Sequence, residues 1–202
     1  MNITNECNME LMSRYEDNYF DLAIVDPPYG TKYHWKKYRN YKVKKWDEIP
    51  DKKYFTELFR VSKNQIIWGG NFFGDYLGSS GCPIIWDKEN GNTSASDGEL
   101  AWCSFKNNQL RIYRQFWWSN MMKATEKPII HPTQKPIKLY EWLLMNYAKE
   151  GDKILDTHLG SGSIAIACHN LGYDLTACEL DKEYYNAAMK RIKRHQQQIQ
   201  MF

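Results

Sequence analysis

The sequence lacks the features that mark metal-bound, disulfide-bonded and membrane proteins. Its five cysteines lie far apart and form no C-x-x-C pair, and its five histidines show no metal-ligand spacing. No apolar run is long enough to cross a bilayer, and nothing at the N-terminus resembles a signal peptide. We therefore expect a cytoplasmic protein with reduced thiols, no metal and no membrane partner.

A strong excess of charge of one sign is also missing. The 27 Lys and Arg residues against 24 Asp and Glu residues leave a net charge of only +3, which is too little to indicate a polyanionic partner by itself. The chain is instead rich in apolar residues: 43% of its 202 residues are hydrophobic, enough for the core of one domain but hardly of two. We expect a single domain over residues 1–202.

Short apolar runs alternate with amphipathic segments along most of the chain. This alternation predicts an α/β fold in which a mostly parallel, twisted sheet carries helices on both faces. Two basic and aromatic stretches, 32–46 and 106–127, show neither the helical nor the strand spacing of apolar residues. We interpret the first as a loop and leave the second unassigned. Strands are predicted at 2–5, 20–25, 64–68, 82–86, 100–105, 153–156 and 174–178, and helices at 10–15, 51–61, 137–148, 163–171 and 181–195.

A glycine-rich turn follows the predicted strand that ends at Asp156. Gly160-x-Gly162-x-x-Ala165 has the spacing that lets a nucleotide approach the backbone, and Glu179 ends the next strand, where a carboxylate can bind ribose hydroxyls. The motif alone also fits a nicotinamide enzyme, or a tight turn that only packs a helix on a strand. It indicates a nucleotide-type ligand without identifying it.

Two consecutive prolines end the second predicted strand. They cannot continue a central ladder because they lack the backbone N–H, so Asp26 must lie at the carboxyl end of that strand. The prolines could be a simple strand terminator followed by a surface turn. However, Asp26 and Asp156 would then share one edge of a parallel sheet, the edge at which open α/β sheets bind ligands. One cleft could hold both motifs.

The run Asp26-Pro27-Pro28-Tyr29 suits methyl transfer to the exocyclic amine of a base. That nitrogen is a poor nucleophile because its lone pair is delocalised into the ring. Asp26 could accept one N–H and the Pro27 carbonyl the other, which would draw the nitrogen towards tetrahedral geometry and aim its lone pair at a sulfonium methyl group. Tyr29 could stack on a base swung out of the duplex.

The order of the motifs resembles that of the beta-class amino methyltransferases of DNA. Asp-Pro-Pro-Tyr at 26–29 comes first, His-Pro-Thr-Gln-Lys-Pro follows at 131–136, and Asp-Thr-His-Leu-Gly-Ser-Gly-Ser at 156–163 comes last. The resemblance implies a Rossmann-like methyltransferase fold with circularly permuted motifs, and S-adenosylmethionine as the cofactor. It further implies a catalytic half at 1–105, a short target-recognition insert at 106–127 and a cofactor-binding half at 128–202.

Carried over position by position, the resemblance assigns roles to most of the cleft. It implies that Asp26, Pro27, Pro28 and Tyr29 act on the target base. Glu6 stands where the family usually has aspartate, and Thr157-His158 where it more often has Pro-Phe, so His158 is either a substitute for the aromatic wall or a packed loop residue. The residues implied at the cofactor are Glu6, Cys7, Asp26, Thr133, Lys135, Pro136, Asp156, His158, Leu159, Gly160, Ser161, Gly162, Glu179 and Leu180.

Basic and aromatic side chains beside these motifs suggest contact with DNA. In the loop that follows the catalytic motif, basic groups could neutralise phosphates while aromatics stack on bases, although a solvated charged loop has a similar composition. Within 106–127, the place of the family's target-recognition region, the Trp117-Trp118 pair could equally belong to the core. The residues predicted to contact the substrate are Tyr29, Lys36, Lys37, Arg39, Arg111 and Arg114.

These observations predict a site-specific methyltransferase that modifies N6 of adenine in double-stranded DNA. Asp26 favours adenine, because family members acting on N4 of cytosine more often begin the motif with serine. RNA or a protein amide are further candidate substrates, and a nucleic-acid-binding module without catalysis and a nicotinamide oxidoreductase remain as alternatives. The family also implies a stand-alone enzyme of bacterial or phage-infected cells, which could act as a homodimer.

Overall fold

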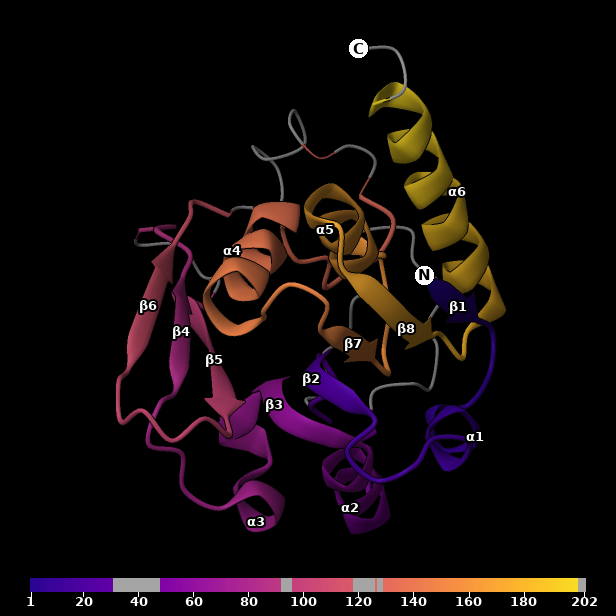
Figure 1. Cartoon of the computed structure of the whole chain (residues 1–202). Helices are drawn as coiled ribbons and strands as arrows, with labels where there is room; N and C mark the ends of the chain where they lie inside the picture. The colour runs from indigo at the N-terminus through magenta and orange to yellow at the C-terminus, as the bar shows by residue number, and fades with distance from the viewer. Residues whose placement is uncertain (31–47, 92–95, 118–125, 127–128, 200–202) are drawn as a thin grey trace.

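The computed structural model describes residues 1–30, 48–91, 96–117, 126 and 129–199. In these residues a central eight-stranded sheet lies between two layers of helices (Figure 1). The strands lie in the order β1-β8-β7-β2-β3-β5-β4-β6. They comprise β1 (Asn2–Thr4), β2 (Phe20–Val25), β3 (Ser62–Trp68), β4 (Ile84–Asp87), β5 (Gly98–Cys103), β6 (Arg111–Arg114), β7 (Lys153–Asp156) and β8 (Asp174–Cys178).

Strand β5 runs against the direction of the other seven. It pairs antiparallel with both β3 and β4, whereas every other pair in the sheet is parallel. The carboxyl ends of β2, β3, β7 and β8 therefore meet at one edge of the sheet. This is the edge at which open α/β sheets bind their ligands.

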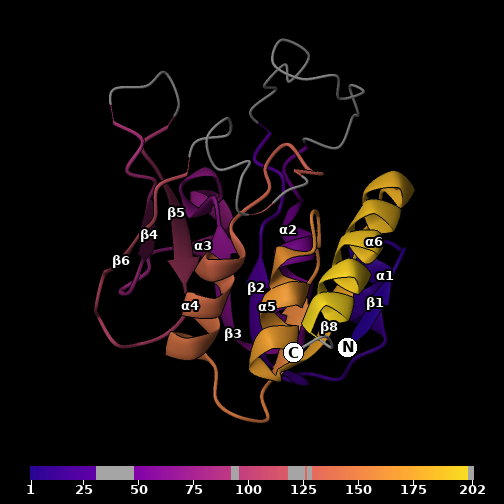
Figure 2. The ribbon, with the colours of Figure 1, turned by 90° about the horizontal axis from the view of Figure 1, so that it is seen from above.

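Helices cover both faces of the sheet. Helices α4, α5 and α6 lie side by side on one face, and α1, α2 and α3 lie on the other (Figures 1 and 2). The helices are α1 (Asn8–Ser13), α2 (Lys52–Val61), α3 (Gly74–Leu77), α4 (Ile137–Tyr147), α5 (Ser163–Leu171) and α6 (Lys182–Ile199), and a short 3-10 turn, η2 (Gly70–Phe72), follows β3.

Strand β2 is apolar on both faces because a layer of helices covers each face of the sheet. Leu22 and Ile24 belong to the core under α4, α5 and α6, whereas Ala23 and Val25 belong to the core under α1, α2 and α3. Successive side chains of a strand point to opposite faces, so a strand covered on both sides must be apolar at every position. The strand that carries Asp26 is thereby held in the middle of the sheet.

The expected fold class is confirmed, with local differences. Helix α3 lies in a segment for which no element was predicted, and α1, β3 and β5 each begin two residues earlier than predicted. Strand β5 is reversed, which no local pattern in the sequence indicates. Strand β6 lies inside the segment left unassigned; it pairs only with β4 and is largely exposed, so its residues need no apolar alternation. Helix α6 continues to Ile199, beyond the predicted end at 195. None of the described helices is long and apolar enough to span a membrane.

Candidate active site

A cavity opens along the carboxyl ends of β2, β3, β7 and β8. The residues that follow these strands, among them Asp26, Gly69, Thr157 and Glu179, all line it. Its volume of about 1570 Å³ exceeds the roughly 300–1,000 Å³ of a typical small-molecule site, so it has room for more than one ligand. The expectation that the two motifs share one cleft is confirmed.

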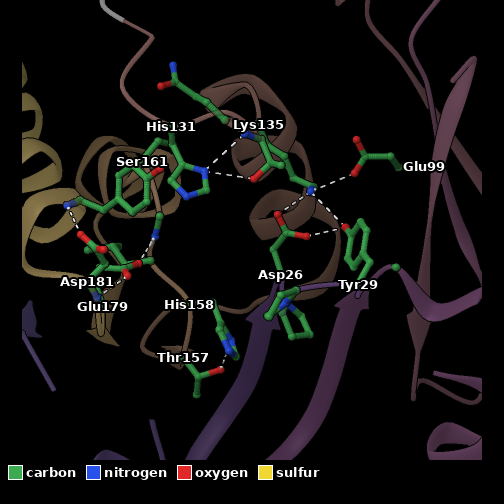
Figure 3. A pocket seen from close by; sticks show the side chains of 18 of the residues that line it. Asp26, Tyr29, Glu99, His131, Lys135, Thr157, His158, Ser161, Glu179 and Asp181 are labelled. Carbon is green, nitrogen blue, oxygen red and sulfur yellow. Dashed lines mark hydrogen bonds and ion pairs between the residues drawn. The ribbon is translucent and has the colours of Figure 1, made fainter. Parts of the chain in front are cut away.

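At one end of the cavity, Asp26 and Tyr29 face each other (Figure 3). Asp26 follows the last residue of β2, and the Tyr29 hydroxyl donates to Asp26 Oδ1 at 2.5 Å. The Tyr29 ring stacks on Phe72, with centroids 5.0 Å apart and planes inclined by 14°. A Cβ at Gly69, which has a φ of +74°, would lie only 2.2 Å from Tyr29 Cε1. Gly69 is thus required both by its backbone conformation and by the ring beside it.

The ammonium group of Lys135 joins Asp26 to a second carboxylate. Lys135 Nζ lies 2.6 Å from Asp26 Oδ2 and 2.9 Å from Glu99 Oε2 (Figure 3). Lys88 Nζ lies 2.7 Å from Glu99 Oε1. We call Asp26, Lys88, Glu99 and Lys135 the charge cluster. The Lys135 side chain is only 2% exposed. Its main chain is fixed as well, because Ser163 Oγ donates to the Lys135 carbonyl oxygen at 2.7 Å.

Burial and pairing act in opposite directions on the acids of the charge cluster. Burial raises the pKa of Asp26, and the Lys135 ammonium opposes that rise. Burial also acts to raise the pKa of Glu99, but Lys135 and Lys88 together outweigh it and lower that pKa to about 2. The pKa of Lys135 is raised, since Asp26 and Glu99 outweigh the opposing effect of burial. Lys135 and Glu99 are therefore charged at neutral pH.

At the other end of the cavity, the glycine turn after β7 meets the acid that follows β8. Glu179 Oε2 accepts from the Gly160 amide at 2.9 Å, and Oε1 accepts from the Asp181 amide at the same distance. A carboxylate oxygen can accept more than one hydrogen bond. Leu180, 72% exposed, adds an apolar surface at the cavity. A carboxylate, an apolar side chain and an approachable backbone are what a nucleoside needs.

His158 lies in the cavity wall as a neutral ring. Asn8 Nδ2 can only donate, so its 3.1 Å contact makes His158 Nε2 the acceptor, and Nδ1 carries the proton towards Thr157 Oγ1 at 3.0 Å. Burial lowers the pKa of His158 to about 4. The ring lies in the cavity wall, as a substitute for the aromatic wall would, and it is also hydrogen-bonded to its neighbours, as a packed loop residue would be.

Glu6 also lines the cavity, and its carboxylate forms an ion pair with Arg14. Arg14 donates to both oxygens, at 2.6 and 2.7 Å, and this pairing lowers the pKa of Glu6. Cys7, Thr133, Leu159 and Ser161 also line the cavity, and their contact with a cofactor stays a prediction.

Three residues of the expected cofactor set support the cavity wall rather than line it. Asp156 is buried and accepts from the His158 amide at 2.9 Å, and burial raises its pKa to about 8. Pro136 caps α4. Gly162 packs α5 against α6, where a Cβ would lie 3.0 Å from Ile192 Cδ1. Their contribution to a ligand would be indirect.

The structure separates the residues expected to contact DNA. Arg111 and Arg114 lie three residues apart on β6, about 10 Å along the strand. Because β6 runs parallel to β4, Arg114 is at the cavity edge of the sheet, 3.4 Å from Asp87 Oδ2, and Arg111 is towards the opposite edge. Trp117 packs against the core. Lys36, Lys37, Arg39 and Trp118 lie outside the described residues.

Sequence reasoning missed Glu99 and Lys88. Glu99 lies on β5, and only its reversed direction brings it beside Lys135. Its one local signal is its place directly before the apolar run Leu100-Ala-Trp-Cys103, and that signal is weak. Sequence reasoning also assigned no role to Gly69 and Phe72, which follow β3 and pack against the Tyr29 ring.

The fold and the cavity place this molecule among proteins of the Rossmann-like methyltransferase fold. It resembles the M1.HpyAVI complex with S-adenosylmethionine, with a TM-score of 0.62 and 18% identity, over 95% of this chain and 98% of that one. It also resembles the cytosine-N4-specific PvuII DNA methyltransferase, with a TM-score of 0.59 and 13% identity, over 96% and 89% of the two chains. At these identities the likeness is evidence of fold alone.

The sequence identifies the family. The N6/N4 DNA methylase family matches residues 85–190, more than half of the chain, so the chain belongs to that family. The type II methyltransferase M2.DpnII of Streptococcus pneumoniae is 37% identical over 81 residues, which are 40% of this chain and 30% of that protein. M.HpaI of Haemophilus parainfluenzae, also a type II methyltransferase, is 24% identical over 91% of this chain and 71% of its own length.

Proposed function

We propose that this protein methylates N6 of adenine in DNA, using S-adenosylmethionine as the methyl donor. The observation that carries the proposal is the single cavity that holds Asp26 and Tyr29 at one end and Gly160 and Glu179 at the other. A donor bound at the glycine end would present its methyl group towards a base held at the Asp26 end. Membership of the N6/N4 DNA methylase family supports the reaction class.

The residues at the base end bind and orient the amine. Asp26 accepts one N–H and the Pro27 carbonyl accepts the other, so the lone pair of the nitrogen points out of the base plane. Tyr29, which lines the cavity beside Asp26, stacks on the base, and Phe72 packs on the Tyr29 ring. Once the new N–C bond has formed, the nitrogen must lose a proton, and the Asp26 carboxylate is the nearest base.

The residues at the glycine end hold the donor. Bound S-adenosylmethionine supplies an electrophilic methyl group on a sulfonium, whose sulfur keeps the electron pair when the bond breaks. Glu179 binds the ribose hydroxyls, Leu180 contacts the adenine ring, and Gly160 and Ser161 line the methionine end of the site. Asp156, Pro136 and Gly162 hold the wall in place.

Duplex DNA would lie across the carboxyl edge of the sheet, where the cavity opens. Arg114 is at this edge and suits a phosphate or base contact, whereas Arg111 is displaced from it. We therefore assign Arg114, rather than Arg111, to the DNA-facing surface; Lys36, Lys37 and Arg39 remain candidates on sequence grounds.

Cytosine N4 is the second candidate target. Its amine offers the same pair of N–H groups, and the PvuII enzyme, which acts on that atom, shares the fold. Adenine is favoured by the aspartate at position 26.

The test is to incubate the purified protein with unmodified duplex DNA and isotope-labelled S-adenosylmethionine, then analyse the nucleosides by mass spectrometry. We expect labelled N6-methyldeoxyadenosine. Labelled N4-methyldeoxycytidine would keep the reaction class and correct the base, and unlabelled nucleosides on DNA of varied sequence would contradict the proposal. Sequencing of modified bases in DNA from expressing cells then gives the recognition site.

Replacing Glu179 with glutamine is expected to weaken binding of S-adenosylmethionine by about 10- to 150-fold. Glutamine keeps one acceptor oxygen but has an NH2 group in place of the other, so the variant loses one charge-assisted hydrogen bond to the ligand, worth roughly 1.5–3 kcal/mol. Isothermal titration gives the affinity, and Glu150→Gln, on an exposed residue, is the matched control. An unchanged affinity would remove Glu179 from the donor site.

A further inference from the structure

The charge cluster contains more charge than the proposed chemistry requires. Two carboxylates and two ammonium groups lie within ion-pair distance of one another: Asp26 with Lys135, Lys135 with Glu99, and Glu99 with Lys88. Buried ion pairs contribute little net stability, because removing the charges from water offsets most of the attraction between them. The presence of Glu99 and Lys88 behind Lys135 therefore calls for a role other than stability.

The present contacts leave the target amine in competition with Lys135. Tyr29 donates to one oxygen of Asp26 and Lys135 to the other. For the base to donate an N–H in good geometry, the ammonium must shift away from Asp26 Oδ2. If Asp26 were its only partner, that shift would leave a buried charge unpaired, which is strongly unfavourable.

Glu99 offers the ammonium a fixed second partner. Its Oε2 lies 2.9 Å from Lys135 Nζ, and Lys88 holds its other oxygen at 2.7 Å. The β5 backbone at Glu99 is paired with Trp86 of β4, and Lys88 Nζ lies 5.0 Å from the centre of the Trp86 ring. Figure 3 shows the Lys135 ammonium between Asp26, Tyr29 and Glu99. Glu99 is thus held in place independently of Asp26.

We propose that Glu99 is a positioning residue for methyl transfer, which holds the Lys135 ammonium while Asp26 takes up the target amine. This inference rests on the proposed function. Lys88 partly neutralises the charge of Glu99 and so weakens the attraction of Glu99 for Lys135. The Lys135 ammonium is therefore shared between Asp26 and Glu99 and does not bind to one of them alone. The reaction then proceeds with Lys135 charged and paired throughout.

The charges around Asp26 and Glu99 affect the pKa of Asp26, which a purely structural role of Glu99 would leave unchanged. The groups that act on the two acids from the surrounding elements are Tyr29, Tyr54, Lys88, Lys135, Tyr140 and Asp156. The Glu99 charge raises the pKa of Asp26. Neutralising Glu99 therefore lowers that pKa, both directly and because Lys135 then pairs with Asp26 alone.

The test compares Glu99→Gln with Glu89→Gln, an exposed acid two residues beyond Asp87. In Glu99→Gln we expect kcat for DNA methylation to fall by about 10- to 100-fold, as Lys135 stays on the oxygen that the amine needs. We expect the acid limb of the pH profile to move to lower pH and the affinity for S-adenosylmethionine to stay unchanged. Glu99→Asp, which keeps the charge, should recover part of the rate and the original acid limb.

Two results would overturn the inference while leaving the proposed function intact. One is a Glu99→Gln variant with the kcat and pH profile of the unaltered protein. The other is a slower variant with an unmoved profile and a lowered melting temperature, which would make Glu99 a purely structural residue. Absence of methylation by the unaltered protein would instead refute the proposed function, and this inference with it.

Discussion

Replacing Asp26 with alanine is expected to lower the rate of DNA methylation by about 10³-fold or more, since a single preorganised polar group at a reacting centre contributes about 10²–10³ in kcat. In the proposed reaction the carboxylate orients one N–H of the amine and accepts the released proton. Affinity for S-adenosylmethionine should stay within about two-fold, because the groups proposed to hold the donor lie at the other end of the cavity. Single-turnover kinetics and calorimetric titration measure the two quantities.

The variant is expected to fold, because Lys135 keeps Glu99 as its counterion when Asp26 is lost. Asp75→Ala, on the exposed side of α3, is the matched control and should methylate at the normal rate. Near-normal turnover by Asp26→Ala would remove this residue from the chemistry, and parallel loss of turnover and donor binding would indicate a general defect of the cavity.

Most of the fold could be predicted because each central element has a strong local pattern. Strand β2 is apolar at nearly every position and ends at two prolines, and β7, α5 and β8 follow one another with a glycine turn between them. Such signals come from burial on both faces and from backbone geometry, which act locally. The direction of β5 and the presence of β6 depend on which strands become neighbours, and no short window of sequence contains that information.

In the candidate site, too, residues in local motifs could be predicted and long-range contacts could not. Asp26, Tyr29, Gly160 and Glu179 could be found because they belong to short motifs at strand ends. The environment of Lys135 could not be predicted. Its motif implied a place at the cofactor, yet its ammonium donates to Asp26, 109 residues away in sequence. Glu99 is brought there only by a reversed strand. Long-range ion pairs leave no local periodicity, so the sequence shows their members only as isolated charges.

Replacing Lys135 with methionine is expected to impair both stability and activity. The change leaves Asp26 and Glu99 without their shared cation, and removing one partner of a buried ion pair costs about 3–5 kcal/mol. Methylation at neutral pH should fall by about 10²-fold or more, because Asp26 is then less ionised and less well placed. The acid limb of the pH profile should move to higher pH, opposite to its movement in Glu99→Gln, since Lys135 opposes the rise in the pKa of Asp26.

The pH dependence of stability tests the same assignment without an activity assay. In Lys135→Met the folded-state pKa of Asp26 rises further above its unfolded value, and the Lys135 part of the stabilisation that keeps the pKa of Glu99 at about 2 is lost. Both effects cost nothing while the acids are protonated. The Glu99 part grows as the pH rises above about 2, and the Asp26 part grows as the pH rises above the raised folded-state pKa of that group. The loss of unfolding free energy relative to the unaltered protein should therefore be larger at pH 8 than at pH 5 in denaturant titrations. Lys53→Met, on an exposed residue of α2, should show no such dependence, and an equal loss at both pH values would mean that Lys135 stabilises the fold by packing rather than by its charge.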